Sequence, residues 1–123
     1  MVSFLGLMNA TLLILLLSPF LIRRINKYFY KNKNKILRNY AGSLSKIHMY
    51  FAYILLITAF VHGYMALGTI RLHSGYILWT FVFTQIILGN MSKKIKKSYL
   101  FKIHRVVGLT SLVFLIIHLI QVN

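Results

Sequence analysis

Two stretches of the sequence decide the fold: KIHMYFAYILLITAFVHG at residues 46–63 and KIHRVVGLTSLVFLIIHL at residues 102–119. Each holds two histidines with the same spacing, H-x13-H, which pairs His48 with His62 and His104 with His118. In an α-helix, this spacing places the second histidine about 40° from the first around the axis and about 21 Å further along it. Each stretch therefore predicts a helix with two histidines near one face, one towards each end.

The composition indicates an integral membrane protein. The chain has 123 residues, of which 59% are hydrophobic, and several long runs carry no charge. It contains 15 Lys and Arg but no Asp or Glu, and these cations gather between the apolar runs. That placement is typical of membrane topology, so we expect no nucleic-acid partner despite the basic charge.

The missing residue types exclude several chemistries. Without Asp or Glu the chain cannot form a paired-acid glycosidase site, a catalytic triad with an acid, or a carboxylate cage for Ca²⁺ or Mg²⁺. Without Cys it cannot form a disulfide, an iron–sulfur cluster, a thiolate zinc site or a covalent haem attachment. Any haem would therefore be bound non-covalently.

The apolar runs predict one domain, residues 1–123, organised as an all-α transmembrane four-helix bundle with up-down-up-down topology. The four expected spans are about 2–22, 44–67, 75–91 and 100–122. We expect Pro19 to kink or end the first span, Ser43 to cap the second and Gly68 to stop it. A cleaved signal peptide is disfavoured for the first run, because no basic segment precedes it. Residues 23–43 are expected to form a solvated or headgroup-lying connector.

The distribution of cations predicts the orientation in a cell membrane. Eight Lys and Arg lie in or beside the first loop, six in or beside the third, and Arg71 alone in the second. The positive-inside rule then places loops one and three in the cytoplasm and both termini outside it. Because the second and fourth spans run parallel, His48 is expected to pair with His104 at the cytoplasmic face and His62 with His118 at the outer face.

Histidines inside membrane spans are costly, so they are functional-site candidates by default. A lone histidine would more often bond another polar group across helices, but four in register favour a bound cofactor. The stripe between the histidines is mostly small, which leaves room for a flat macrocycle; its residues are Ala52, Leu55, Ala59, Gly108, Ser111 and Leu115. A bare zinc or copper ion would need three or four converging ligands, and each level offers two.

The repeated H-x13-H, the Arg105 directly after His104 and the Gly108 one turn on resemble the di-haem four-helix core of transmembrane b-type cytochromes. This group includes respiratory cytochrome b and the ferric reductase and NADPH oxidase-like proteins. The resemblance covers essentially the whole chain. It implies that His48, His62, His104 and His118 are axial ligands of two haems b.

Cations at both levels could bind the haem propionates, since Arg and Lys pair with carboxylates. Arg105 and Lys46 flank the inner pair, while Arg71 and His73 lie near the outer pair. Two alternatives stay open. Arg71 could be an interfacial residue that reaches out to water, and His73 is better interpreted as an ordinary exposed histidine.

The expected function is transmembrane electron transfer, with two axial imidazoles leaving the iron no open position. The donor would be a cytoplasmic protein such as a flavoprotein, or a membrane quinol, and the acceptor would be ferric iron, oxygen or a redox partner. One alternative is an oxidoreductase enzyme, quinol-dependent or superoxide-oxidising. The other is a non-redox metal-binding or assembly subunit. Gln85 and Asn9 are expected to be interhelical hydrogen-bonding residues.

Overall fold

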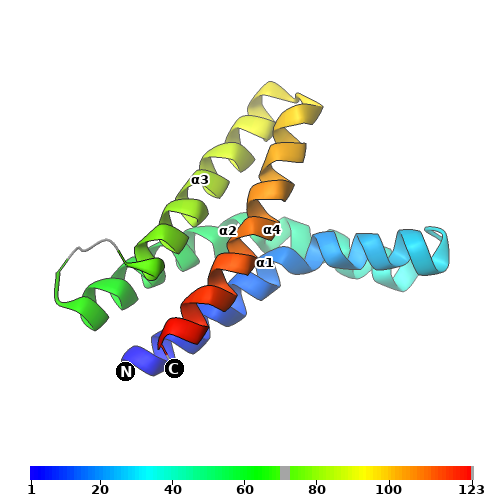
Figure 1. The fold of residues 1–123 in the computed structure, drawn as a ribbon. Coiled ribbons are helices and arrows are strands. Elements are labelled where there is room, and N and C mark those ends of the chain that lie inside the picture. The colour runs from blue at the N-terminus through cyan, green and yellow to red at the C-terminus, as the bar shows by residue number, and fades with distance from the viewer. Residues whose placement is uncertain (70–72, 123) are drawn as a thin grey trace.

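The computed structural model describes residues 1–69 and 73–122, which form four α-helices. These are α1 (Val2–Tyr30), α2 (Lys35–Leu67), α3 (Ser74–Ile95) and α4 (Ser98–Val122). Figure 1 shows two hairpins, α1 with α2 and α3 with α4, which cross near their middles. Both termini lie at the same end of the molecule. The all-α four-helix prediction is confirmed.

The turn between α1 and α2 is much tighter than the sequence suggested. The two helices extend into the expected connector, residues 23–43, and only residues 31–34 separate them. The buried Asn26 side chain holds this turn, since its Nδ2 donates to the Asn34 carbonyl at 3.1 Å and its Oδ1 accepts from the Asn34 amide at 3.2 Å. Asn34 also caps α2 by accepting from the Leu37 amide at 3.2 Å. The prediction of Ser43 as the cap is therefore wrong, because a better-placed asparagine starts the helix earlier in the chain.

Pro19 and Gly68 affect their helices in different ways. Pro19 lies buried inside α1 without ending it, and Figure 1 shows α1 changing direction in its middle third, as expected where a proline removes a backbone donor. Gly68 ends α2 as predicted. Its backbone has φ 65°, in the left-handed region that glycine adopts without strain, and its amide bonds the Tyr64 carbonyl at 2.8 Å.

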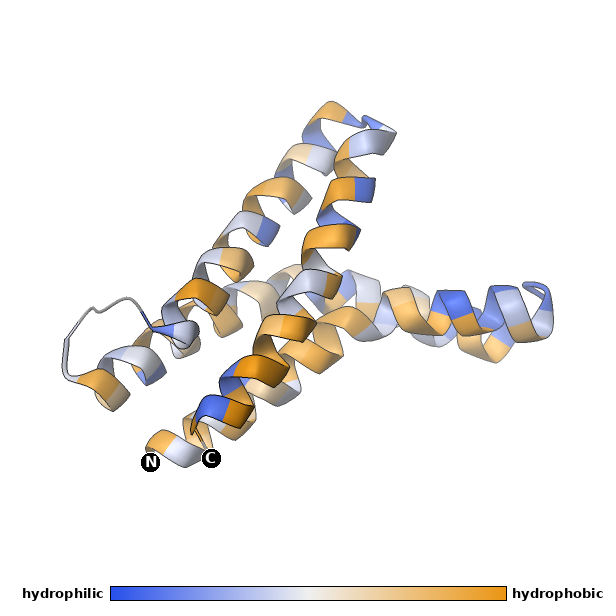
Figure 2. Cartoon of the chain, in the orientation of Figure 1, coloured by the Kyte–Doolittle hydropathy of each residue, from blue (hydrophilic) through white to orange (hydrophobic). Residues whose placement is uncertain are grey.

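Three of the described helices, α1, α2 and α4, are long and apolar enough to cross a membrane. Their outer surfaces are largely hydrophobic, as Figure 2 shows, which suits contact with lipid. The 22-residue α3, expected to be a fourth span, is not among them. Its Thr80, Thr84, Gln85 and Asn90 interrupt the apolar sequence and lower its mean hydropathy.

Side chains from all four helices meet in one small core. Its buried members are Ala10, Leu13, Leu55, Val82 and Leu115. Beyond this core the two hairpins diverge, so their turns lie far apart in Figure 1. The divergence opens a space between the hairpins on the side away from the termini.

The Asn26 interaction gives a first test. Asn26→Ala should destabilise the protein by about 1–3 kcal/mol, because the backbone groups of Asn34 lose their buried partners. Thermal unfolding in detergent, followed by circular dichroism, would measure this. Lys33→Ala, in the same turn but exposed, is the matched control and should leave the midpoint unchanged. Equal midpoints for the two variants would contradict the structural role of Asn26.

Candidate functional site

The inner histidines come together across the two hairpins. His48 of α2 and His104 of α4 have ring centroids 6.2 Å apart, with an angle of 66° between the ring planes. Two imidazoles on opposite sides of one metal ion, at about 2.0–2.1 Å per nitrogen, would have centroids roughly 6.3 Å apart, since each nitrogen lies about 1.1 Å from its centroid. The observed separation would therefore let the two rings hold one metal ion between them.

Backbone contacts orient both rings. The His104 Nδ1 lies 3.1 Å from the Gln85 carbonyl oxygen, so a proton on Nδ1 would leave Nε2 free as a ligand. The ring also packs over Gly89, where an added Cβ would lie 3.5 Å from its Cε1. Beside the His48 ring lies the backbone of Leu16 in α1. The two candidate ligands are thus fixed by α3 and α1, neither of which supplies a ligand at this level.

The inner pair opens onto a cavity of about 800 Å³ between the hairpins, lined by residues of all four helices. Ligand sites commonly measure about 300–1,000 Å³, so the volume is ample for a large cofactor. Three of the small residues singled out from the sequence, Ala52, Gly108 and Ser111, are buried and line it. Ala59 instead packs against the hydrophobic core, closer to the other end of α2.

Gly108 lies close to the side chain of Gln85. A Cβ at this position would lie 3.0 Å from the Gln85 Nε2 and 3.5 Å from the Leu17 Cδ2. That amide nitrogen is buried without a hydrogen-bond partner, although the sequence suggested that Gln85 bonds another helix. Gln85 therefore contributes a backbone acceptor to His104, while its side-chain donor is buried and unpaired.

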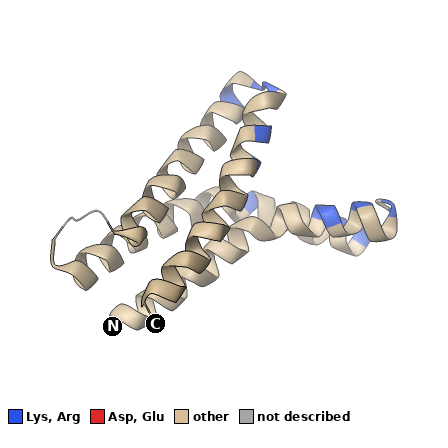
Figure 3. Cartoon of the chain, in the orientation of Figure 1, with Lys and Arg blue, Asp and Glu red and all other residues tan. Residues whose placement is uncertain are grey.

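Cations from all four helices surround the mouth of the cavity. They are Arg23, Arg24, Lys27, Arg38, Lys93 and Arg105. Figure 3 shows the described Lys and Arg confined to the two diverging arms, with none of them near the termini. Lys46, expected beside the inner pair, is exposed and is not part of the lining, because it lies on another face of α2. Arg24 and Lys93 also line the cavity, although they were not predicted to belong to the site. The crossing of the hairpins brings them there.

The outer histidines have a different environment. The His62 ring packs over Gly6 of α1, where an added Cβ would lie 3.1 Å from its Cε1, and its Nδ1 is buried without a partner. The His118 Nδ1 lies 2.9 Å from the Ser74 hydroxyl, and its ring packs over Gly75. Neither ring lines the 800 Å³ cavity.

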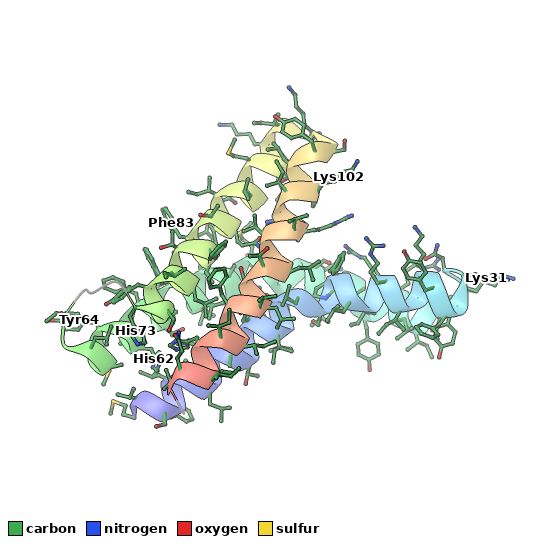
Figure 4. The ribbon with its side chains drawn as sticks, viewed as in Figure 1. Lys31, His62, Tyr64, His73, Phe83 and Lys102 are labelled. Atoms are coloured by element: carbon green, nitrogen blue, oxygen red, sulfur yellow. The ribbon has the colours of Figure 1, made fainter. Side chains whose placement is uncertain are left out.

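His73, which was expected from the sequence to be an ordinary exposed histidine, also belongs to this end of the bundle. It is half-buried rather than exposed, with its ring centroid 6.0 Å from that of His118, and it caps α3 by accepting from the Gly75 amide at 3.5 Å. Figure 4 shows His62 and His73 at the same end of the bundle, and both are ionisable neighbours of His118. A cap signal at the start of α3 could have found this residue. Arg71, assigned to the outer level from the sequence, lies outside the described residues.

A bare metal ion fits the site less well. Within the described part of the chain, no three His, Cys, Asp or Glu side chains converge as a metal site requires. Two imidazoles beside a large cavity suit a cofactor that brings its own equatorial ligands.

Comparisons with models of protein families, with curated proteins and with solved structures find no match to this chain.

The glycines provide a matched pair of substitutions. Gly108→Ala should destabilise the protein by about 1–3 kcal/mol, because the added Cβ crowds Gln85. Gly42→Ala, also within a helix but with nothing inside 4 Å of its Cβ, should instead stabilise it by about 0.5–1 kcal/mol. Unfolding in detergent would measure both. Adding Gln85→Ala to Gly108→Ala should recover part of the lost free energy of unfolding. If the full loss persisted, crowding of Gln85 would not be its cause.

Proposed function

We propose that the protein is a small multi-pass cytochrome of the cell membrane that transfers electrons across the bilayer through two haems b. His48 and His104 would hold the inner haem, and His62 and His118 the outer one. The observation that carries the proposal is the 6.2 Å separation of the His48 and His104 rings at the wall of a cavity of about 800 Å³. The proposed direction is from a cytoplasmic donor or membrane quinol to an outward acceptor.

The residues of the inner site fit such a group. A haem with two axial imidazoles supplies a one-electron iron centre that favours electron transfer over oxygen binding. A proton on His104 Nδ1, donated to the Gln85 carbonyl, would leave Nε2 to hold the group. The small side chain of Ala52 leaves space, and the cations that line the cavity offer partners for propionates.

The outer site has fewer supporting observations. His62 and His118 lie at the same end, and the orphaned His62 Nδ1 and the Ser74-bound His118 Nδ1 leave each ring with a nitrogen for a ligand. Gly6 and Gly75 let both rings lie close to helix backbones. The core residues Leu13, Leu55 and Leu115 are buried together and would lie between the two haems.

Haem content and coordination test the assignment. Protein fully supplied with haem should give two haems per chain by pyridine haemochrome analysis, both six-coordinate and low-spin. His104→Ala should remove the inner haem or convert it to high spin, because one axial ligand is lost, and His118→Ala should do the same to the outer haem.

His73→Ala is the matched control, since it removes a neighbouring imidazole that the proposal does not use as a ligand. Both haems should remain six-coordinate in this variant. A colourless protein would end the haem assignment, and loss of both haems from every single substitution would point to one shared site.

Orientation is tested separately. Because the cations flank the two turns and not the termini, a reporter active only in the cytoplasm should give no signal when fused after residue 123. The same reporter inserted at Lys33, in the α1–α2 turn, should be active. The reverse pattern would invert the topology and exchange the inner and outer sites.

A further inference from the structure

Two arginines from different hairpins meet at one aromatic ring. The guanidinium carbon of Arg24, in α1, lies 5.2 Å from the centroid of Phe20, and that of Arg105, in α4, lies 5.9 Å from the same centroid. All three side chains line the 800 Å³ cavity. Attraction to the ring favours each contact, and the two contacts place one guanidinium from each hairpin beside the same aromatic side chain.

No side chain in this protein can neutralise that pair, because the sequence contains no Asp or Glu. Arg24 donates to the Tyr28 hydroxyl at 3.0 Å, which leaves most of its five N–H donors available. Both arginines are exposed, so solvent screens their charges, and their remaining donors are accessible to a ligand in the cavity. An anion that binds both would have to come from outside the chain.

We propose that Arg24 and Arg105 form one carboxylate-binding clamp, positioned by Phe20, that takes the two propionates of the haem held by His48 and His104. This inference rests on the proposed function. Arg105 follows the ligand His104 directly in the sequence, whereas Arg24 belongs to α1, which carries no histidine. The guanidinium fork matches a carboxylate with two parallel hydrogen bonds, which favours arginine over lysine for this role.

The clamp gives α1 a role in cofactor binding. Through Arg24 and Phe20 it would connect the first hairpin to the second across the space where they diverge. The phosphate of an anionic lipid could meet the same two cations, since both groups accept paired hydrogen bonds from arginine. A test must therefore separate propionate from lipid phosphate.

The experiment compares haem with its dimethyl ester, which has the same iron and ring but no carboxylates. The full-length apoprotein in neutral detergent is titrated with each, and the Soret band reports binding. The unsubstituted protein should bind haem at least tenfold more tightly than the ester. Arg24→Gln should lose most of this preference by weakening haem binding alone, and Phe20→Leu should lose part of it.

Lys33→Gln is the charge-matched control, because Lys33 is exposed in the α1–α2 turn and does not line the cavity. It should keep the full preference for haem. If Arg24→Gln weakened the binding of haem and of the ester equally, or weakened neither, the clamp would be overturned. The proposed haem site would still stand. A parallel assay measures the binding of phosphatidylglycerol vesicles to the same variants. If Arg24→Gln weakened vesicle binding but left haem binding unchanged, the clamp would also be overturned. Failure of the unsubstituted protein to bind either ligand would overturn the proposed function together with the clamp.

Discussion

The candidate site depends on the approach of His48 to His104, which brings together one imidazole from each hairpin. Beyond the small core the hairpins diverge, and both imidazoles line the cavity between them. His104 is half-buried, and its Nδ1 lies within hydrogen-bond distance of the Gln85 carbonyl oxygen. With a proton on Nδ1, Nε2 is the nitrogen left to bind a ligand in the cavity.

The absence of acidic residues leaves the positive charge along the rest of the cavity uncompensated. Six cations line it, and the sequence holds no acidic side chain to neutralise them. Their positive potential makes the space between the arms attractive to anions. In the proposed orientation the same residues would also favour a cytoplasmic position for the two turns, so the site would lie near the cytoplasmic face.

The sequence was sufficient for what depends on local pattern. It predicted the helices, the stop at Gly68 and the partners His48 and His104, because helical periodicity and the repeated H-x13-H carry that information. It missed what depends on how the hairpins cross. Arg24 reaches the cavity from α1 although it lies far from His104 in the sequence. Asn26 bonds Asn34, which confines the turn to fewer residues than the expected connector. Neither contact follows from spacing within one helix.

The two ends of the bundle differ although the sequence repeats. At the inner level both rings face a cavity with cations at its mouth, whereas at the outer level His118 already contacts His73 and Ser74. A cofactor entering the outer level would have to displace the His73 ring or pack against it, and no cation is described there to bind carboxylates. At the inner level both rings line the cavity instead. The repeat thus sets the spacing of the candidate ligands, and the neighbouring residues make the two levels different.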